Sequence, residues 1–380
     1  MSKSRPYRWI AEPQGLEELA SALDAHGSHC LDSESNSGFA YEERLCLLQL
    51  NVGGELWLVD LLALPGEAAA LDPLRPVLES PIHTTFLHGG EFDVGCLKRD
   101  YTLDLHGVWD TQQAASFLGW PKTGYGAVVE RICGVTLPKG HAHHDWGRRP
   151  IETVPLQYAL DDVFYLPAVA EHLRQEVAAA DLEEEVAIAN RAVEESTWNG
   201  GFSADGFWRV KGVRRLAPVE VAVLASLYAW RDAQARQQNL PPGRVLNDRL
   251  LLALSRTNAS SPEDLRRAGI QGGKLNRWGG ELMRRVRSVR RDPPNLSPPA
   301  TAARESDPVA RERGERLKAW RQQEAERRQV PIQVVLPATA LRHLQRHGAE
   351  DLEPVPQLGA KRIRLYGDKL GELCRLDESR

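Results

Sequence analysis

The spacing of apolar positions divides the chain into two parts with different predicted structures. In residues 1–200 an amphipathic helical pattern at Glu17–Leu23 precedes several short apolar runs of the kind that form strands. The predicted strands are Cys30–Ser33, Leu45–Val52, Leu56–Leu62, Thr84–Leu87 and Thr102–Leu105. Helical patterns follow at Gln112–Leu118 and Ala127–Cys133, and from Pro155 onward. Strands first and helices later predict a mixed sheet flanked by helices.

Two of the predicted strands are joined by a turn that the sequence marks clearly. Leu45–Val52 and Leu56–Leu62 flank Gly53-Gly54, a dipeptide typical of a hairpin. Because a hairpin pairs its strands antiparallel, the predicted sheet contains at least one antiparallel pair.

The second part, residues 201–380, is rich in helix formers and contains an internal repeat. Trp230-Arg231 recurs as Trp320-Arg321, ninety residues later. At the same offset Val219, Leu227, Pro241, Val245 and Leu246 match Val309, Leu317, Pro331, Val335 and Leu336. After a three-residue deletion, Glu263-Asp264-Leu265, Lys274 and Gly280 match Glu350-Asp351-Leu352, Lys361 and Gly367. Each copy predicts a helical domain of roughly 80 residues with its tryptophan in the core.

The predicted domain boundaries follow from these patterns. We expect an α/β domain over residues 1–205, a first helical repeat over 206–291 and a second helical repeat over 309–380. The intervening residues 292–308 are rich in Pro, Ser and Ala, which is the composition of a linker.

Charge is distributed unevenly along the chain. Residues 1–200 carry 14 Lys and Arg against 31 Asp and Glu, whereas residues 201–380 carry 34 against 21. An acidic part joined to a basic part favours a metal-holding region beside a region that binds a polyanion. The alternative is an uneven surface without functional meaning.

The bulk properties exclude several classes of protein. The longest apolar stretch, Val221–Trp230, has ten residues, whereas a membrane helix needs about 20. The polar N-terminus carries no apolar signal core, so we expect a cytoplasmic protein without membrane contact. The five scattered cysteines include no Cys-x-x-Cys pair, which argues against a zinc site or a disulfide framework.

Four carboxylates and one tyrosine are the candidate chemical groups. Asp32 and Glu34 lie two apart on a predicted strand, so they project from the same face. Asp93 follows another predicted strand after a Gly-rich turn. Tyr158 and Asp162 lie four apart, which places them on one face of a helix. Carboxylates gathered from separate elements repel one another, and a divalent cation is the usual remedy.

The hard oxygen ligands favour Mg²⁺ or Mn²⁺, and two such ions about 3.5–4 Å apart form a site that cuts phosphodiesters. Tyr158, with an unperturbed pKa near 10, would orient the attacking water rather than deprotonate it. Taken singly, each motif is more often a solvated surface carboxylate. The order and spacing of all three motifs make that alternative a poor account of the set.

These motifs carry a resemblance to a known family. Asp32-Ser33-Glu34, His88-Gly89-Gly90-Glu91-Phe92-Asp93 and Tyr158-Ala159-Leu160-Asp161-Asp162 resemble the three exonuclease motifs of the DEDD superfamily, in its DEDDy branch. Asp110-Thr111-Gln112-Gln113-Ala114-Ala115 and Asp145-Trp146 before Arg149-Pro150 are similar to segments of the ribonuclease D family. The two repeats resemble the HRDC domain, a helical module that ribonuclease D shares with RecQ helicases.

The resemblance implies a ribonuclease H-like exonuclease domain followed by two HRDC-like domains. It implies a 3′→5′ exoribonuclease with two metal ions that trims precursor transfer RNA and other small structured RNAs. It assigns metal binding to Asp32, Glu34, Asp93 and Asp162, and water orientation to Tyr158. We read the neighbouring Asp161 as lying outside the metal set. The products expected are nucleoside 5′-monophosphates, and no obligate protein partner is indicated.

Some features depart from the family pattern or leave alternatives open. Ser35 stands where many relatives have a bulky apolar residue, which leaves the seat of the terminal base undefined. We interpret His141-Ala142-His143-His144 as a flexible surface loop, with contact to metal or phosphate as the alternative. Candidate RNA-binding residues in the first repeat are Arg284, Arg285 and Arg287, although arginines on a helix are often only a solvated face. A DNA-directed exonuclease and a catalytically silent RNA-binding protein are the alternatives.

Overall fold

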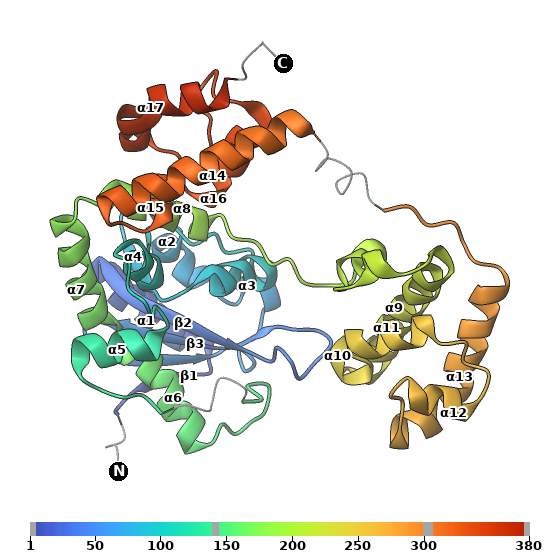
Figure 1. The fold of residues 1–380 in the computed structure, drawn as a ribbon. Helices are drawn as coiled ribbons and strands as arrows, with labels where there is room; N and C mark the ends of the chain where they lie inside the picture. The colour runs from blue at the N-terminus through green and yellow to red at the C-terminus, as the bar shows by residue number, and fades with distance from the viewer. Residues whose placement is uncertain (1–4, 139–143, 299–306, 376–380) are drawn as a thin grey trace. The chain divides into compact units, whose positions relative to one another are not determined.

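The structure, a computed structural model, describes residues 5–138, 144–298 and 307–375 (Figure 1). These residues form two compact units. The first unit contains residues 5–35, 44–198 and 307–375, and the second contains 36–43 and 199–298. The second repeat therefore belongs to the same unit as the sheet. Within the described ranges, no helix is long and apolar enough to cross a membrane.

Six strands form one mixed sheet in the order β1-β4-β3-β2-β5-β6. They are β1 (Arg8–Ile10), β2 (Ser28–Ser35), β3 (Leu45–Val52), β4 (Glu55–Asp60), β5 (Thr84–Leu87) and β6 (Val108–Asp110). β2, β3 and β4 pair antiparallel, and β3 and β4 form the hairpin predicted around Gly53-Gly54. β1 is parallel to β4, and β5 and β6 extend the sheet in parallel from β2. The predicted mixed sheet is confirmed, and β2 lies inside it.

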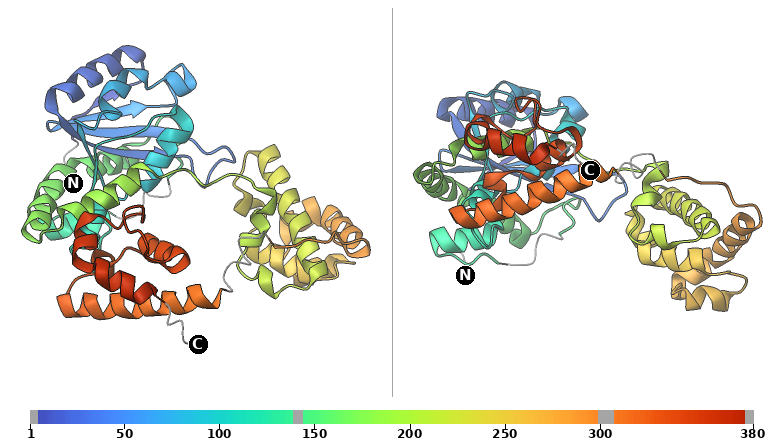
Figure 2. Two further views of the ribbon diagram at one scale, coloured as in Figure 1. Left: turned by 90° about the horizontal axis from the view of Figure 1, so that it is seen from above. Right: turned by 45° about the horizontal axis from the view of Figure 1, so that its top comes forward.

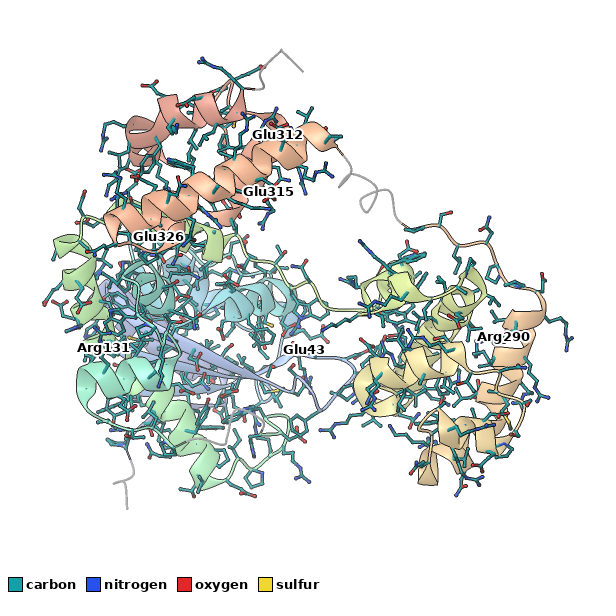
Figure 3. All side chains as sticks on the ribbon, in the orientation of Figure 1. Glu43, Arg131, Arg290, Glu312, Glu315 and Glu326 are labelled. Atoms are coloured by element: carbon teal, nitrogen blue, oxygen red, sulfur yellow. The ribbon has the colours of Figure 1, made fainter. Side chains whose placement is uncertain are left out.

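Helices cover both faces of the sheet, so strands β2 to β5 contribute to two cores. The helices are α1 (Pro13–His26), α2 (Arg75–Leu78), α3 (Glu91–Tyr101), α4 (Thr111–Phe117), α5 (Tyr125–Cys133), α6 (Thr153–Phe164), α7 (Leu166–Ala179) and α8 (Glu183–Glu194). Leu31 and Leu48 join the core that α1 and α3 cover, whereas Cys30 and Leu47 join the core under α4 to α7. This burial on both faces explains the continuous apolar runs in the sequence. At the edge of the second core, the Arg131 guanidinium of α5 stacks 3.7 Å from the Trp120 ring centroid (Figure 3).

The strand predicted at Thr102–Leu105 is wrong, and β1 and β6 were not predicted. Leu103 and Leu105 alternate with polar residues and are fully buried, which is the pattern of a strand. Their segment nevertheless bonds to helix ends. The Leu103 N–H donates to the Leu97 carbonyl at 3.4 Å, and the His106 N–H donates to the Leu78 carbonyl at 3.0 Å. The alternation of apolar and polar residues in this segment therefore reflects the burial of Leu103 and Leu105, and the segment pairs with no strand of the described residues.

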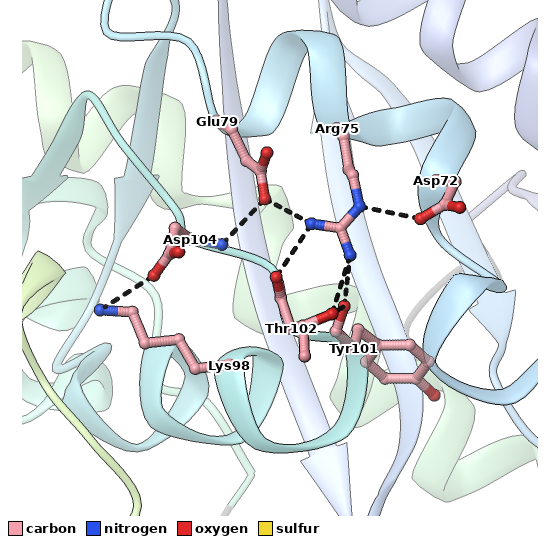
Figure 4. A network of polar contacts seen from close by, with 7 residues as sticks. All are labelled: Asp72, Arg75, Glu79, Lys98, Tyr101, Thr102 and Asp104. Atoms are coloured by element: carbon pink, nitrogen blue, oxygen red, sulfur yellow. Dashed lines mark hydrogen bonds and ion pairs between the residues drawn. The ribbon is translucent and has the colours of Figure 1, made fainter.

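The C-terminal end of α3 is fixed by a polar network centred on Arg75 (Figure 4). The Arg75 guanidinium donates to the Thr102 carbonyl at 2.9 Å and to Asp72 at 2.8 Å. It also donates to Glu79, whose carboxylate accepts from the Asp104 N–H at 3.1 Å. The network joins α2 to the end of α3 and so fixes the direction of the helix that begins beside Asp93.

Each repeat forms a helical bundle around its own core, as predicted. The first contains α9 (Pro218–Gln238), α10 (Pro242–Val245), α11 (Asp248–Arg256), α12 (Pro262–Arg267) and α13 (Gly272–Arg291). The second contains α14 (Pro308–Arg328), α15 (Ile332–Val335), α16 (Ala338–His347) and α17 (Ala360–Cys374). Trp230 is buried against Trp278, and Trp320 packs against Tyr366 at the matching place. The prediction that these tryptophans are structural is confirmed.

The second repeat packs directly on the helices of the first unit, and its orange and red helices lie against that unit in Figures 1 and 2. Val334 is buried in the same core as the sheet and α7. The Gln333 side-chain amide donates to the Ser116 carbonyl of α4 at 2.9 Å. The Lys361 ammonium lies 3.3 Å from the Glu185 carboxylate of α8, which is 2 % exposed. This repeat is thus a structural part of the unit that contains the sheet.

The two repeats also differ in the partner of a matching lysine. In the first repeat, the Lys274 ammonium donates to the Arg244 and Val245 carbonyls at the end of α10. At the matching place in the second repeat, Arg362 donates to the carbonyls of Gln333 and Val334. Lys361, the counterpart of Lys274, pairs instead with Glu185 of α8.

Candidate active site

Asp32 and Glu34 lie on the inner strand β2. Their side chains share the face of Cys30, because side chains two residues apart project to the same side. This face belongs to the core beneath α6, and α6 packs directly on β2 and β3. Both side chains are partly exposed, so the carboxylates lie at the edge of that core.

Asp93 lies in the first turn of α3, which follows β5 through the turn His88-Gly89-Gly90. Its carboxylate is 7 % exposed and accepts a hydrogen bond from the Ser33 hydroxyl of β2. Ser33 therefore links the first and second sequence motifs. An N-terminal helix turn also favours the charged form of a carboxylate.

Tyr158 and Asp162 lie on α6 and face the same site, as their four-residue spacing predicted. The Tyr158 hydroxyl hydrogen-bonds to the Asp162 carboxylate. On its other side, the Tyr158 ring lies 6.5 Å, centroid to centroid, from the buried ring of Trp146. The loop that carries Trp146 is tied to the sheet by Arg149, which donates to both oxygens of Asp60.

The four carboxylates interact electrostatically, which places them at one site. Burial raises the pKa of Glu34 to about 9, and the charges of Asp162 and Asp93 add to the rise. Burial also raises the pKa of Asp162 to about 8, although the Tyr158 hydrogen bond opposes the change. Burial raises the pKa of Asp93 less, to about 6, because the hydrogen bond from Ser33 stabilises the charged form of this carboxylate. The pKa of Asp32 is raised well above its usual range by burial and by the other three acids.

This donor set fits a divalent cation in its chemistry. When ionised, these neighbouring carboxylates repel one another, a cation would neutralise that charge, and their oxygens are ligands that Mg²⁺ and Mn²⁺ prefer. In the parts of the chain that the structure describes, no three His, Cys, Asp or Glu side chains stand at ligand distance from a common point.

Asp161, next to Asp162, has other partners. Its carboxylate lies 2.9 Å from the Arg5 guanidinium and accepts from the Gln157 amide at 3.2 Å. The Tyr125 hydroxyl donates to its carbonyl at 3.1 Å. The pKa of Tyr125 is raised by burial and by the charges of Asp162 and Asp32, so this ring lies close to the acids. The sequence carried no pattern that singled out Tyr125.

Asp110 organises the site from beneath, a role that sequence reasoning missed. Its fully buried carboxylate accepts from the N–H groups of Gly89 and Gly90 at 3.1 and 2.8 Å. It also caps α4, accepting from Gln112 and Gln113 at 2.8 and 3.1 Å. Gly89 has a φ of +72°, and an added Cβ would come within 2.9 Å of Gln112. The Asp-Thr-Gln-Gln sequence at the end of a strand was the available signal, because it is an N-cap pattern.

Comparisons with known proteins show which family the chain belongs to. Residues 7–178 match the model of a 3′-5′ exonuclease domain, and residues 220–286 and 311–374 match the HRDC domain. Ribonuclease D of Sphingobium indicum is 31% identical over 291 residues, which are 72% of this chain and 71% of that protein. The chain belongs to the ribonuclease D family. The prediction of a 3′–5′ exoribonuclease is thereby confirmed.

Two further similarities define how far the ribonuclease D architecture extends. The crystal structure of Escherichia coli RNase D, 24% identical, superposes with a TM-score of 0.71 and covers 97% of this chain and 98% of that chain. This likeness confirms the predicted fold of an exonuclease domain followed by two helical domains. Protein RRP6-like 1 of Arabidopsis thaliana is 26% identical over 277 residues, which are 69% of this chain but only 42% of that longer protein.

The remaining candidate residues have separate positions. Arg284 and Arg287 are exposed on α13, the helix that also carries Arg290 in Figure 3. Arg285 is partly buried and donates to the Ser226 hydroxyl at 3.3 Å. His141 and His143 lie outside the described residues, whereas the His144 ring packs edge-on against Trp146.

Proposed function

We propose that this protein is a divalent-metal-dependent exoribonuclease that trims the 3′ ends of precursor transfer RNA and other small structured RNAs. The electrostatic interaction of Asp32 with Glu34, Asp93 and Asp162, together with the hydrogen bond between Tyr158 and Asp162, is the observation that supports the proposal. The expected products are nucleoside 5′-monophosphates. Escherichia coli RNase D, described as an exoribonuclease involved in structured RNA processing, supports the choice of substrate.

The four carboxylates would hold the metal ions. Two divalent cations bound there would supply an activated water and neutralise the charge on the leaving 3′-oxygen. The chain's own contribution is to hold the acids in place before substrate arrives. Ser33 and the first turn of α3 orient Asp93, and the Tyr158 hydroxyl orients Asp162.

Tyr158 would position the attacking water. Burial and the charges of Asp162, Glu34 and Asp32 raise its pKa above 10, so the phenol stays neutral at physiological pH. A neutral phenol cannot serve as a general base. Its proton is directed to Asp162, and the phenol oxygen would accept a hydrogen bond from the attacking water.

The first repeat would supply affinity for RNA through phosphate contacts. Residues 201–380 carry an excess of basic groups, and the exposed guanidinium groups of Arg284 and Arg287 lie three apart on α13. Spacing of three places them on the same side of the helix. Phosphate binding does not distinguish bases, in keeping with trimming of several RNAs.

The test is the Asp32→Asn variant on a 3′-extended transfer RNA. We expect trimming to be abolished while the circular dichroism spectrum and thermal midpoint are retained. Asp24→Asn is the matched control, because Asp24 lies on α1 with its side chain 77 % exposed. Undiminished trimming by Asp32→Asn would contradict the assignment. RNA binding with no trimming by the wild-type chain in Mg²⁺ or Mn²⁺ would indicate a silent RNA-binding protein.

A matched DNA substrate decides between the two nucleic acids. The metal chemistry cuts either backbone, and only contacts to the 2′-hydroxyl distinguish RNA from DNA. We expect faster trimming of the RNA strand than of a DNA strand of the same sequence. Equal or faster trimming of DNA would replace the proposal with a DNA-directed exonuclease.

A further inference from the structure

The loop between β2 and β3 is bound to the first repeat. Residues Asn36–Glu43 belong to the compact unit of that repeat, although they continue directly from the strand that carries Asp32 and Glu34. Figure 3 labels Glu43, the last residue of this loop. Within the loop, the Asn36 carbonyl accepts from the Phe39 N–H at 3.0 Å, and the Asn36 side chain donates to the Glu42 carbonyl at 3.4 Å. The loop thus has a defined conformation of its own.

Tyr41 makes the central contacts of the loop with α9. Its hydroxyl donates to the Asp232 carboxylate at 2.8 Å and accepts from Arg236 at 3.2 Å. Its backbone N–H donates to the Asn239 side chain, which ends α9, at 3.0 Å. The Tyr41 ring packs against the hydrophobic core of the first repeat. The backbone N–H, the ring and the hydroxyl of Tyr41 therefore all contact residues at the C-terminal end of α9.

Phe39 makes a second contact, with α10. The Arg244 guanidinium lies 4.9 Å from the centroid of the Phe39 ring, within the range of a cation–π interaction. Two aromatic side chains of one short loop thus contact two successive helices of the repeat. This arrangement resembles the way peptides are held by aromatic anchors at protein interfaces.

The internal repeat shows that this corner is a docking face. Gly243 and Arg244 of the first repeat match Gln333 and Val334 of the second at the offset of ninety residues. Gln333 and Val334 attach the second repeat to α4 and to the core beneath the sheet. The same corner, the end of the long helix with the short helix after it, therefore binds a segment of the exonuclease domain in both copies.

We propose that Asn36–Glu43 is a docking strap that joins the first repeat to the catalytic strand β2. The strap couples RNA held by that repeat to trimming at the carboxylates. Tyr41 is its principal positioning residue. The inference of coupling rests on the proposed function, whereas the docking itself does not.

The test compares Tyr41→Ala with Tyr7→Ala in the full chain. Tyr7 is an exposed tyrosine outside the strap and serves as the matched control. Hydrogen–deuterium exchange is expected to rise in residues 36–43 and at the end of α9 in Tyr41→Ala alone. Asn239→Ala, which removes the partner of the Tyr41 N–H, should raise exchange in the same segments. Unchanged exchange in both variants would overturn the docking.

Two RNA substrates test the coupling. Without the docking contact, the first repeat is joined to the catalytic strand only through the chain, which lowers the effective concentration of bound substrate, so trimming of a 3′-extended structured RNA should fall about tenfold in Tyr41→Ala. Trimming of a short single-stranded oligonucleotide, which needs no second binding region, should stay within about twofold of wild type. Equal loss on both substrates, or no loss on either, would overturn the coupling. If the wild-type chain trims neither substrate, the proposed function and with it the coupling fail, and the exchange data still decide the docking.

Discussion

The Asp110 carboxylate accepts a hydrogen bond of 2.8 Å from the N–H of Gly90, three residues before Asp93. The same carboxylate caps α4, so one buried group fixes the first turns of two helices. We expect Asp110→Asn to lower the trimming rate about a hundredfold by displacing Asp93. Loss of a charged acceptor should also lower the free energy of unfolding by about 2 kcal/mol.

The measurement for Asp110→Asn is the trimming rate across a Mn²⁺ titration, together with thermal unfolding. A displaced Asp93 should raise the Mn²⁺ concentration needed for half-maximal rate, which simple loss of stability would not do. Asp104→Asn is the control, because the Asp104 side chain is 64 % exposed in the same unit. If Asp110→Asn needs the same Mn²⁺ concentration as wild type for half-maximal rate, the position of Asp93 does not depend on Asp110.

Removal of the Tyr158 hydroxyl should affect chemistry and not folding. Tyr158→Phe keeps the ring that packs near Trp146 but removes the group that would orient water. We expect turnover to fall about a hundredfold, with metal binding retained. Tyr165→Phe is the control, because that hydroxyl accepts from Arg5 at 2.9 Å. Comparable rates for the two variants would exclude the role of Tyr158.

The metal-free protein should lose stability as the pH rises. The carboxylates of Asp93, Asp162 and Glu34 have raised pKa values of about 6, 8 and 9. The folded chain therefore keeps protons that the unfolded chain releases near pH 4, and folding is favoured most below that pH. In a chelator, the thermal midpoint should therefore fall as the pH rises from about 4 to about 9, most steeply below pH 6, where all three carboxylates contribute.

Divalent cations should reverse this pH dependence, because a cation replaces the bound protons and binds better as they leave. Adding Mg²⁺ or Mn²⁺ should therefore raise the thermal midpoint more at pH 9 than at pH 6. Glu34→Gln in chelator should show a shallower fall than wild type. A midpoint that rises with pH in the metal-free chain would contradict the raised pKa values.

Breaking the Lys361–Glu185 pair should destabilise the first unit. Lys361→Met leaves the buried Glu185 carboxylate without its cation, at a cost of about 3 kcal/mol. Pairing it with Glu185→Gln should restore most of the loss, because neither charge then remains buried alone. Lys369→Met is the control, since Lys369 pairs with Glu372 on the exposed side of α17. Chemical denaturation of the three variants measures the difference.

Arg284 and Arg287 should contribute to RNA affinity in a salt-dependent way. Each phosphate contact that is lost should reduce the slope of log affinity against log salt by about 0.7 for a single strand. Arg284→Ala and Arg287→Ala are therefore expected to weaken binding of all RNA sequences alike. Arg285→Ala is the control, because Arg285 is engaged by Ser226 and Glu281. Equal slopes in all variants would remove α13 from the RNA contact surface.

Local spacing predicted those parts of the site that depend on one element. The two-residue spacing of Asp32 and Glu34 and the four-residue spacing of Tyr158 and Asp162 gave the correct faces. Spacing could not reveal the hydrogen bond from Ser33 to Asp93, because it joins elements sixty residues apart. The pair formed by Lys361 and Glu185 was hidden for the same reason.

The errors in the predicted fold have a related cause. The alternation of apolar and polar residues at Thr102–Leu105 arises because Leu103 and Leu105 are buried, and the segment has no strand partner in the part of the chain that the structure describes. The repeat predicted two similar domains, but Gln333, Val334 and Lys361 attach the second copy to the unit that contains the sheet. Whether a surface is free or attached depends on its partner, which lies elsewhere in the chain.

The place of Val334 in the core beneath the sheet has a consequence for the order of assembly. The sheet and its helices leave the ribosome long before α15 does, so that core stays incomplete while the first repeat and the linker are being synthesised. The core beneath the sheet is therefore complete only when the second repeat has been synthesised.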